Sequence, residues 1–467
     1  MSQYVLNTPL IVNSTSSGIV VPRLTTAQKI AASATSGMVV FDTDIQDFEF
    51  YNGYTWVGTG YSYTGPLFSS NTVDGFGRIR VSNPFTLFDS SNHYRNNEKF
   101  SYNYYGAGAT GSFDATTSIQ SLTVSGSNTS VIAEAKRVCS YQPGKSLLVM
   151  CSFAPNETIV SGVTQRVGYF MATNGVYFQI DGPTASVNLL DNGVTTSVLQ
   201  TNWNQDMLNG SGPSGITADW TKAQLLYICI EWLGVGTVEV GFVANQQFIP
   251  VHKFWGMNSY TTTYMQSANL PVRYELFTSG SPSTGTLKQI CSTVISEGGY
   301  QGTSTKNYFN LWDQTVNTKT VSSTTVWTPI FSMSLSTGCL NAIIIPSQVD
   351  LFLTTNGTIQ YKLALNGVLS GASWTGAAYD SSVVVDYSAT SITFNRNTKI
   401  LDMNFVTSSN QAKSILSSSA SDFNFQLGRS LSGLNTYTSD VLTVCAVSLG
   451  GSTSVTGDIG WWEIGMM

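Results

Sequence analysis

Short apolar runs, each followed by a polar turn, make up most of this chain. In the middle of the chain they are Ser146–Phe153, Arg166–Phe170, Val176–Ile180, Ala223–Trp232, Thr237–Val243 and Val272–Phe277. Further on they are Ala342–Ile345, Val349–Leu353, Ile359–Leu363, Val383–Val385 and Val441–Val447. Runs of this kind, rich in β-branched and aromatic residues and bounded by Gly, Asn and Ser, are typical of strands. The pattern predicts an all-β protein with β-sandwich or jelly-roll-like domains.

The beginning of the chain predicts a small β-hairpin unit. Val39–Phe41 and Phe48–Tyr51 have the composition of strands, and the polar turn between them is Asp44–Asp47. Asn52–Gly53 predicts a two-residue hairpin turn, because both residues accept positive φ, and Asn174–Gly175 predicts another in the middle of the chain. A modest helix is expected at Thr25–Ala34.

The aromatic residues of this hairpin unit need something to pack against, because two strands alone are only marginally stable in water. They are Phe41, Phe48, Phe50, Tyr51 and Trp56. Two partners are possible. The hairpin can form a cap on the next domain, or it can pack against copies of itself around a three-fold axis.

Two changes in composition mark the expected domain boundaries, and both are rich in Gly and polar residues: Gly58–Gly65 and Glu297–Lys306. They divide the chain into an N-terminal attachment or oligomerisation unit at 1–62, a central β-sandwich domain at 66–300 and a C-terminal β-sandwich domain at 305–467. Both sandwich domains are long enough to have a core of their own.

Charged residues are scarce. They make up 10% of the chain, compared with about 25% in a typical soluble domain. A surface of hydroxyl and amide groups is more typical of a protein in an extracellular assembly than of a cytosolic enzyme. The formal net charge is −6, the isoelectric point is near 5.0 and the lysines are scattered along the sequence, so we expect no nucleic acid partner.

The six cysteines lie far apart, without a C-x-x-C pair, and we expect them to be buried free thiols. This suits assembly in a reducing cytoplasm. The N-terminus lacks the features of a secretory signal, and no apolar stretch is long enough to span a bilayer. We therefore expect no membrane partner, and release to the outside as part of a particle.

Motifs for cofactor binding are weak. Gly106–Gly111 fits G-x-G-x-x-G, but no helical period follows it, so a glycine loop is the better interpretation. Pro143–Ser146 is similar to the end of a P-loop without its first glycine, which favours a turn that enters a strand. No cofactor is expected.

Catalytic residues are equally hard to find. The two histidines, His93 and His252, have no Ser-His-Asp context and no G-x-S-x-G elbow. Asp42, Asp44 and Asp47 could hold calcium, but their spacing favours a solvated acidic turn, and no metal is expected. A glycan hydrolase needs two carboxylates in one cleft. Asp219 and Glu231 are the least implausible pair, although Glu231 fits better as a buried partner, for example of Arg273.

Near the C-terminus, Trp461 and Trp462 are adjacent. Docking at an assembly interface and simple burial in a core both explain such a pair.

Two groups of motifs resemble known families. The series Val21–Gln28 (VPRLTTAQ, which includes Arg23), Gly37–Asp44 (GMVVFDTD) and Phe48–Trp56 (FEFYNGYTW) resembles a segment of tail fibres, head fibres and other surface proteins of tailed bacteriophages. The resemblance implies an attachment or oligomerisation role for this region, with Arg23, Phe41, Asp42, Phe48, Phe50, Tyr51 and Trp56 as its candidate residues.

The second resemblance begins at Val73–Ser82 (VDGFGRIRVS) and continues with Leu87–Asp89. Its later blocks are Trp203–Asn204, Gly212–Thr217, Thr221–Gln224, Glu231–Gly236, Asn269–Glu275 and Glu297–Gly299. This series is similar to structural proteins of large tailed phages and other large viruses. It implies a sandwich scaffold and no catalytic residues.

Together these observations predict a non-enzymatic structural protein of the virion: a surface fibre, a head decoration or a tail-associated protein. Its expected partners are copies of itself in a homotrimer and other virion proteins. A glycan-binding adhesin that recognises the host surface is the alternative, and a polysaccharide depolymerase is a weaker one.

Overall fold

The computed structural model describes residues 21–58, 83–280, 282–300, 304–377, 381–408, 413–417 and 425–464. Its contacts divide the chain into two compact units, unit 1 at Met1–Ser69 and unit 2 at Ser70–Met467. Residues 59–65 of the first expected boundary, and the segment Val73–Ser82, lie outside the described residues. The all-β prediction is confirmed, since strands make up most of both units.

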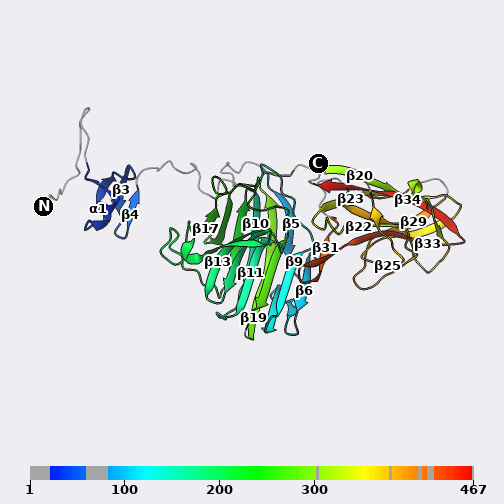
Figure 1. The fold of residues 1–467 in the computed structure, drawn as a ribbon, viewed down its shortest axis with the longest axis horizontal. Helices are drawn as coiled ribbons and strands as arrows, with labels where there is room; N and C mark the ends of the chain where they lie inside the picture. The colour runs from blue at the N-terminus through cyan, green and yellow to red at the C-terminus, as the bar shows by residue number, and fades with distance from the viewer. Residues whose placement is uncertain are drawn as a thin grey trace, which may run out of the picture. The chain divides into compact units, whose positions relative to one another are not determined.

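Unit 1 is a small sheet with a short helix (Figure 1). The strand order is β1-β2-β3-β4, in which β1 is parallel to β2 and the other pairs are antiparallel. The strands are β1 (Arg23–Leu24), β2 (Val39–Asp42), β3 (Asp47–Tyr51) and β4 (Trp56–Gly58). Both strands predicted for the hairpin are therefore confirmed.

Helix α1 (Thr26–Ala31) begins with a capping box. The Thr25 hydroxyl accepts a hydrogen bond from the Gln28 backbone N–H at 3.2 Å, and the Gln28 side chain accepts one from the Thr25 N–H at 2.9 Å. The helix ends at Ala31, three residues before the predicted end. The residues that follow are mostly Ser and Thr, whose side chains compete for backbone hydrogen bonds, and Gly37 at φ +87° then directs the chain into β2.

The two Asn-Gly turns are longer than predicted. Tyr51 pairs directly with Trp56, so the loop contains four residues, and the Asn52 side chain accepts hydrogen bonds from the backbone N–H groups of Tyr54 and Thr55. In unit 2, Phe170 pairs with Gly175, which again leaves four residues between the strands. The prediction of two-residue turns is wrong, because the Asn side chain itself closes the longer turn at Asn52.

The first part of unit 2 is a two-layer β-sandwich, which we call sandwich 1 (Figure 1). One layer has the order β17-β16-β15-β10-β19-β8-β7, and β5 also pairs with β19. Its strands are β5 (Phe85–Ser91), β7 (Thr110–Asp114), β8 (Ile119–Gly126), β10 (Leu147–Ala154), β15 (Gln224–Ile230), β16 (Val238–Ala244), β17 (Gln247–Phe254) and β19 (Ser283–Ser296).

The second layer of sandwich 1 has the order β14-β13-β12-β11-β18-β9-β6. Its strands are β6 (Phe100–Tyr105), β9 (Ser130–Ala135), β11 (Val163–Phe170), β12 (Gly175–Asp181), β13 (Thr184–Asp191), β14 (Val194–Leu199) and β18 (Val272–Thr278), and a 3-10 turn, η1 (Gln200–Asn202), follows β14. One buried cluster lies between the layers, with Val149 and Val294 from the first layer and Tyr169 and Val176 from the second. The alternation of buried and half-buried residues along β8 shows that this strand has one inward face.

The second part of unit 2 is another two-layer arrangement, sandwich 2, with its own buried cluster. One layer has the order β20-β34-β23-β30, with β21 beside β34, and the other has the order β26-β27-β22-β33-β24-β29. The strands of the first layer are β20 (Ser304–Asn310), β21 (Lys319–Val321), β23 (Ile343–Leu353), β30 (Lys413–Ser417) and β34 (Thr453–Ile464), and η2 (Leu311–Asp313) follows β20. Those of the second are β22 (Thr328–Leu335), β24 (Thr358–Leu365), β26 (Thr375–Gly376), β27 (Val383–Asp386), β29 (Lys399–Thr407) and β33 (Val441–Ser448). Two small two-stranded sheets complete sandwich 2. In one, β25 (Val368–Ser370) pairs with β28 (Ser391–Thr393), and in the other β31 (Arg429–Gly433) pairs with β32 (Thr436–Ser439).

Strand β23 joins two runs that the sequence predicts as separate strands. The break between Ala342–Ile345 and Val349–Leu353 is a shift in register between Pro346 and Gln348, opposite β34. Proline cannot donate to the ladder, so the strand bulges there and then continues.

The cysteines form no disulfide bonds in the described part of the chain, but they are not all buried. Cys139, Cys151, Cys229 and Cys445 are buried, whereas Cys291 is exposed and Cys339 is half-buried. The expectation of burial is wrong for Cys291, which lies on an outward-facing position of β19.

A buried ionic network, the junction network, connects the two sandwiches. Glu134 of β9 accepts hydrogen bonds from Arg273 of β18 at 2.9 Å and from Arg429 of β31 at 2.8 Å. All three side chains are almost fully buried, with 1–3% of their side-chain surface exposed. The chain therefore places one carboxylate of sandwich 1 between a guanidinium of its own sheet and one from sandwich 2.

Further hydrogen bonds complete the junction network. The Tyr437 hydroxyl donates to Glu134 at 3.1 Å, and burial, together with the Glu134 charge, raises the pKa of Tyr437 to about 12. Arg273 also donates to Glu275 at 3.0 Å and to Asn435 at 2.7 Å. The carboxylates that bind Arg273 are thus Glu134 and Glu275, instead of the Glu231 suggested by the sequence.

Backbone and apolar contacts lie along the same interface between the two sandwiches, which we call the seam. The Arg429 N–H donates to the Lys136 carbonyl at 2.9 Å, and the Leu431 N–H donates to the Ser101 hydroxyl at 2.8 Å. Figure 1 shows β31 beside β6 and β9. Val138 of sandwich 1 is buried in one cluster with residues of sandwich 2: Ile343, Ile345 and Ile464. Polar and apolar contacts together hold the sandwiches against each other.

Arg429→Met should lower the free energy of unfolding of unit 2 by about 3 kcal/mol, because removal of one partner leaves a buried carboxylate undercompensated. Urea denaturation followed by tryptophan fluorescence measures this change. The matched control is Arg396→Met, since Arg396 is exposed. Equal stability of the two variants would show that the junction network does not stabilise unit 2.

Candidate functional site

The sheet of unit 1 has two faces of different character. Paired residues of neighbouring strands point to the same side, so Val40 and Glu49 share one face, and Val39 and Phe50 share the other. Helix α1 lies on the side of Val40 and Glu49, because its Lys29 contacts Glu49 and Asp42.

The side of the sheet that α1 covers contains a buried ionic cluster. The Lys29 ammonium lies 2.7 Å from Asp42 and also bonds to Glu49, and all three residues are buried. The Thr26 hydroxyl donates to Asp42 at 2.9 Å, and the Thr26 N–H donates to Asp44 at 2.9 Å. The Lys29 hydrogen bond is the main cause that lowers the pKa of Asp42 to about 2. The acidic turn expected to be solvated is therefore partly internal, and it attaches the helix to the sheet.

The other side of the sheet is an aromatic face. We define it by the residues Arg23, Val39, Phe41, Phe48, Phe50 and Val57. Phe41 and Phe48 make an edge-to-face contact with ring centroids 5.1 Å apart, and the Arg23 guanidinium lies 5.4 Å from the Phe41 ring. Val39 is 40% exposed and Phe48 is 46% exposed.

The predicted site residues of this region fall on both faces. Arg23, Phe41, Phe48 and Phe50 meet on the aromatic face. The other three do not join them: Asp42 is buried under α1, and Tyr51 and Trp56 contact each other with ring centroids 5.4 Å apart. The sequence analysis missed Lys29, since a single lysine in a short helix gives no signal that it is buried.

The two adjacent tryptophans near the C-terminus, Trp461 and Trp462, differ in burial and in the residues that they contact. Trp461 is fully buried in the core of sandwich 2, where its indole N–H donates to Glu463 at 2.9 Å. Trp462 is half-buried and packs on the cluster that joins the two sandwiches, with the Lys306 ammonium 5.3 Å from its ring. Adjacent residues of a strand point to opposite sides, which explains the difference. Within the described part of the chain, the pair serves the core and the junction.

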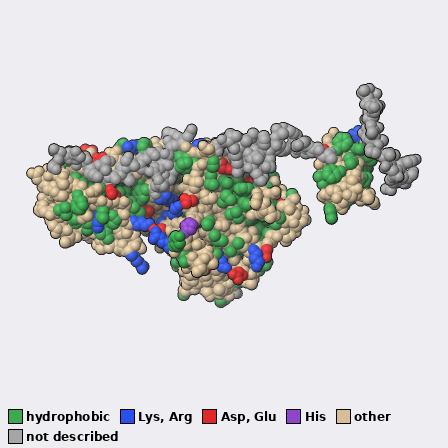
Figure 2. All heavy atoms as spheres, turned by 180° about the vertical axis from the view of Figure 1, so that it is seen from behind, with side chains coloured by type: hydrophobic (Ala, Val, Ile, Leu, Met, Phe, Trp, Pro, Cys, Tyr) green, Lys and Arg blue, Asp and Glu red, His purple; other side chains and the backbone are tan. Residues whose placement is uncertain are grey.

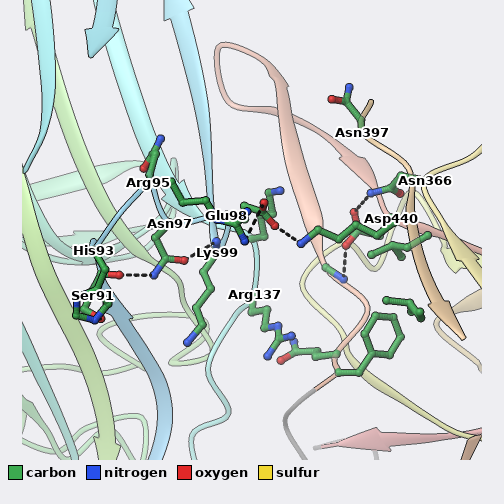
Figure 3. A pocket seen from close by; sticks show the side chains of 18 of the residues that line it. Ser91, His93, Arg95, Asn97, Glu98, Lys99, Arg137, Asn366, Asn397 and Asp440 are labelled. Carbon is green, nitrogen blue, oxygen red and sulfur yellow. Dashed lines mark hydrogen bonds and ion pairs between the residues drawn. The ribbon is translucent and has the colours of Figure 1, made fainter. Parts of the chain in front are cut away.

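A cleft, the junction cleft, opens beside the contact between the two sandwiches. Its volume is about 830 Å³. Sandwich 1 contributes the connection from Ser91 to Lys99 and the segment Lys136–Arg137. Sandwich 2 contributes the end of β24 with Asn366, Asn397 and the start of β29, the segment from Phe425 to Gly428, and Asp440 (Figure 3). Figure 2 shows Lys and Arg side chains gathered at a hollow between the two sandwiches.

The charges of the junction cleft are mostly positive. Its cations are Arg95, Lys99, Lys136, Arg137 and Lys399, and its carboxylates are Glu98 and Asp440. The hydrogen bond from Lys399 is the main cause that lowers the pKa of Glu98. Three lysines that lie far apart in the sequence, Lys99, Lys136 and Lys399, are thus brought together in space, which the sequence analysis did not foresee.

The histidines differ in environment. His252 lies in β17 among buried residues, and burial lowers its pKa to about 4, so it is a neutral core residue at pH 7. His93 is exposed at the junction cleft, with its Nε2 atom 3.2 Å from the Ser91 hydroxyl. Among the described residues, no carboxylate binds its other ring nitrogen, as a catalytic triad would require.

The structure also shows where the two weak cofactor-type motifs of the sequence lie. Residues 106–109 connect β6 to β7, Gly111 is already part of β7, and Pro143–Ser146 precedes β10. In the described ranges, no group of three or more His, Cys, Asp or Glu residues could hold a metal ion. No helix in the described part of the chain has the length and apolar character needed to cross a membrane.

The N-terminal part of the chain is similar to one known protein family. Residues 7–73 match a family described as a phage tail like trimerisation region. The match supports a phage tail-type protein, a virion component that associates with itself as a trimer, and it agrees with the first resemblance. The second resemblance, at 73–299, stays a prediction.

No curated protein matches the chain. Similar solved structures include the Emp47p carbohydrate recognition domain, with 8% identity, 46% of this chain and 98% of that chain covered, and a TM-score of 0.31. A carbohydrate esterase from the Shiga toxin-encoding bacteriophage phi24B has 12% identity, 46% and 99% coverage and a TM-score of 0.30. A β-glucanase of Bacillus licheniformis has 10% identity, 45% and 98% coverage and a TM-score of 0.29.

Unit 1 should lose stability in acid. Because the folded pKa of Asp42 is about 2 and its unfolded value is near 4, its contribution is present above about pH 4 and is lost as the pH falls to about 2. Calorimetry of the wild type and Asp42→Asn should give a higher transition temperature for the wild type at pH 7. The difference should shrink between about pH 4 and about pH 2. A constant difference over this range would contradict the Lys29–Asp42 account.

Proposed function

We propose that this protein is a tail-associated structural protein of a phage virion, which forms a trimer through unit 1 and presents the two joined sandwiches on the particle. The observation that carries the proposal is the agreement between the family match at residues 7–73 and the compact unit at Met1–Ser69.

The aromatic face supplies a surface for such an assembly. Unit 1 places charged residues inside, under α1, and apolar residues such as Val39 and Phe48 at positions that remain 40% and 46% exposed. Apolar side chains at the surface of so small a unit favour association with further copies. Around a three-fold axis, three aromatic faces can bury one another and make a common core.

The proposed role is structural and not enzymatic. His252 is a neutral core residue, and the contact between Ser91 and His93 lacks an orienting carboxylate among the described residues. The low share of charged residues, 10% of the chain, suits a surface that stays soluble in a crowded particle through hydroxyl and amide groups. Other virion proteins are the proposed partners of the assembled trimer.

Val39→Lys should abolish the trimer. The substitution places a lysine on the aromatic face, and the three-fold axis would bring three like charges together in an apolar interface. Size-exclusion chromatography with light scattering should give three times the chain mass of 50.3 kDa for the wild type and one chain mass for the variant.

The matched control is Ile30→Lys, which adds the same charge at a 72% exposed position of α1, on the other side of the sheet. It should leave the trimer intact. A wild type that elutes as a monomer would refute the trimer. Equal loss of the trimer in both variants would show that the aromatic face is not the interface.

A further inference from the structure

The junction cleft concentrates positive charge in a chain that has little of it. Five of the 21 Lys and Arg residues line the cleft, together with two carboxylates. The cleft therefore has a net charge of +3, although the whole chain has a net charge of −6. Cations of one protein repel one another, so such a concentration requires a reason beyond solubility.

The two carboxylates have partners that belong to the protein. Glu98 pairs with Lys399 across the seam between the sandwiches. Asp440 accepts hydrogen bonds from the Asn366 side chain at 2.8 Å and from the Gly428 N–H at 3.1 Å, and these contacts fix the loops of sandwich 2 (Figure 3). The acidic groups thus organise the walls of the cleft.

Lys99 pairs with Asp89 at 2.9 Å, whereas two other cations, Arg95 and Lys136, are less satisfied. The Arg95 guanidinium is 81% exposed and lies 3.8 Å from Glu98, a weak contact. Lys136 is half-buried, and among the described residues its ammonium group makes no hydrogen bond or ion pair. A half-buried ammonium group in a polar cleft is a ready partner for an anion supplied by a ligand.

Neutral groups of the junction cleft suit a sugar. Asn397 lines it at an exposed position, and its amide can both donate and accept hydrogen bonds, as hydroxyl groups require. The Tyr94 ring, also part of the lining, is 96% exposed and offers a flat apolar surface to a sugar ring. Cations, an amide and an aromatic ring together match a ligand that has both acidic groups and hydroxyls.

We propose that the junction cleft binds an acidic oligosaccharide, whose carboxylate, sulfate or phosphate groups contact Arg95 and Lys136. A volume of about 830 Å³ accommodates a few sugar units. An extended nucleic acid instead needs a basic stripe along the surface, and the cleft is a confined site. This binding requires only unit 2 and is independent of the trimer.

The test uses isothermal titration calorimetry on the full chain with four probes of similar length. An oligogalacturonate carries carboxylates, a heparin-type oligosaccharide carries sulfates, a maltooligosaccharide is neutral, and poly-L-glutamate is an anion without sugar rings. We expect binding of at least one acidic sugar, weakened when NaCl is raised from about 0.05 M to about 0.5 M. The first two probes distinguish carboxylate from sulfate recognition.

Arg95→Gln with Lys136→Met should weaken binding of the acidic sugar at least about tenfold, because two charge-assisted contacts are lost. The matched control, Lys222→Gln with Lys288→Gln, removes two charges outside the cleft and should bind like the wild type. Thermal unfolding shows whether the variants are folded. Arg95→Gln alone, at an exposed position, is a second test if the double variant is unstable.

Three results would overturn the proposal. The first is the absence of binding to both acidic sugars. The second is equal weakening in the cleft variant and the control. The third is equal or tighter binding of the neutral sugar or of poly-L-glutamate, because the site would then not recognise the combination of acidic groups and sugar rings.

Discussion

Glu134 makes the contact on which the arrangement of unit 2 depends. Its carboxylate lies at the centre of the seam, where it binds Arg273 of its own sheet and Arg429 of the other sandwich, with Tyr437 as a third donor. A buried carboxylate is costly unless its hydrogen bonds are complete, so the two sandwiches can separate only by leaving Glu134 undercompensated. This constraint, with the apolar cluster around Val138, holds the walls of the junction cleft in place.

The same use of charge occurs in unit 1. Lys29, Asp42 and Glu49 are buried under α1 and fix the helix, while Val39 and Phe48 remain partly exposed on the opposite face. In both units, buried ionic groups thus fix a neighbouring element against a sheet, while aromatic residues such as Phe48 of unit 1 stay partly exposed. Such a division suits a protein that assembles with copies of itself and is displayed on a particle.

The sequence predicts the strands well and the contacts between distant residues poorly. Alternating apolar positions are local, so β2, β3 and most strands of unit 2 follow from them. The four-residue loop at Asn52 was missed because its closure depends on a side-chain hydrogen bond. The aromatic face was anticipated through Phe41, Phe48 and Phe50. The junction network and the cleft join residues up to about three hundred positions apart, such as Lys399 and Glu98, and no local pattern reports such pairings.

Hydrogen–deuterium exchange of the hairpin β31–β32 tests the junction most directly. If Glu134 and its partners hold the two sandwiches together, peptides from Arg429–Ser439 should exchange as slowly as peptides from the core strand β18, and Glu134→Gln should accelerate their exchange. Exchange of Arg429–Ser439 in the wild type as fast as in an unprotected peptide would show that the hairpin is not held. The conclusion that the two sandwiches are joined and form a stable cleft would then be wrong.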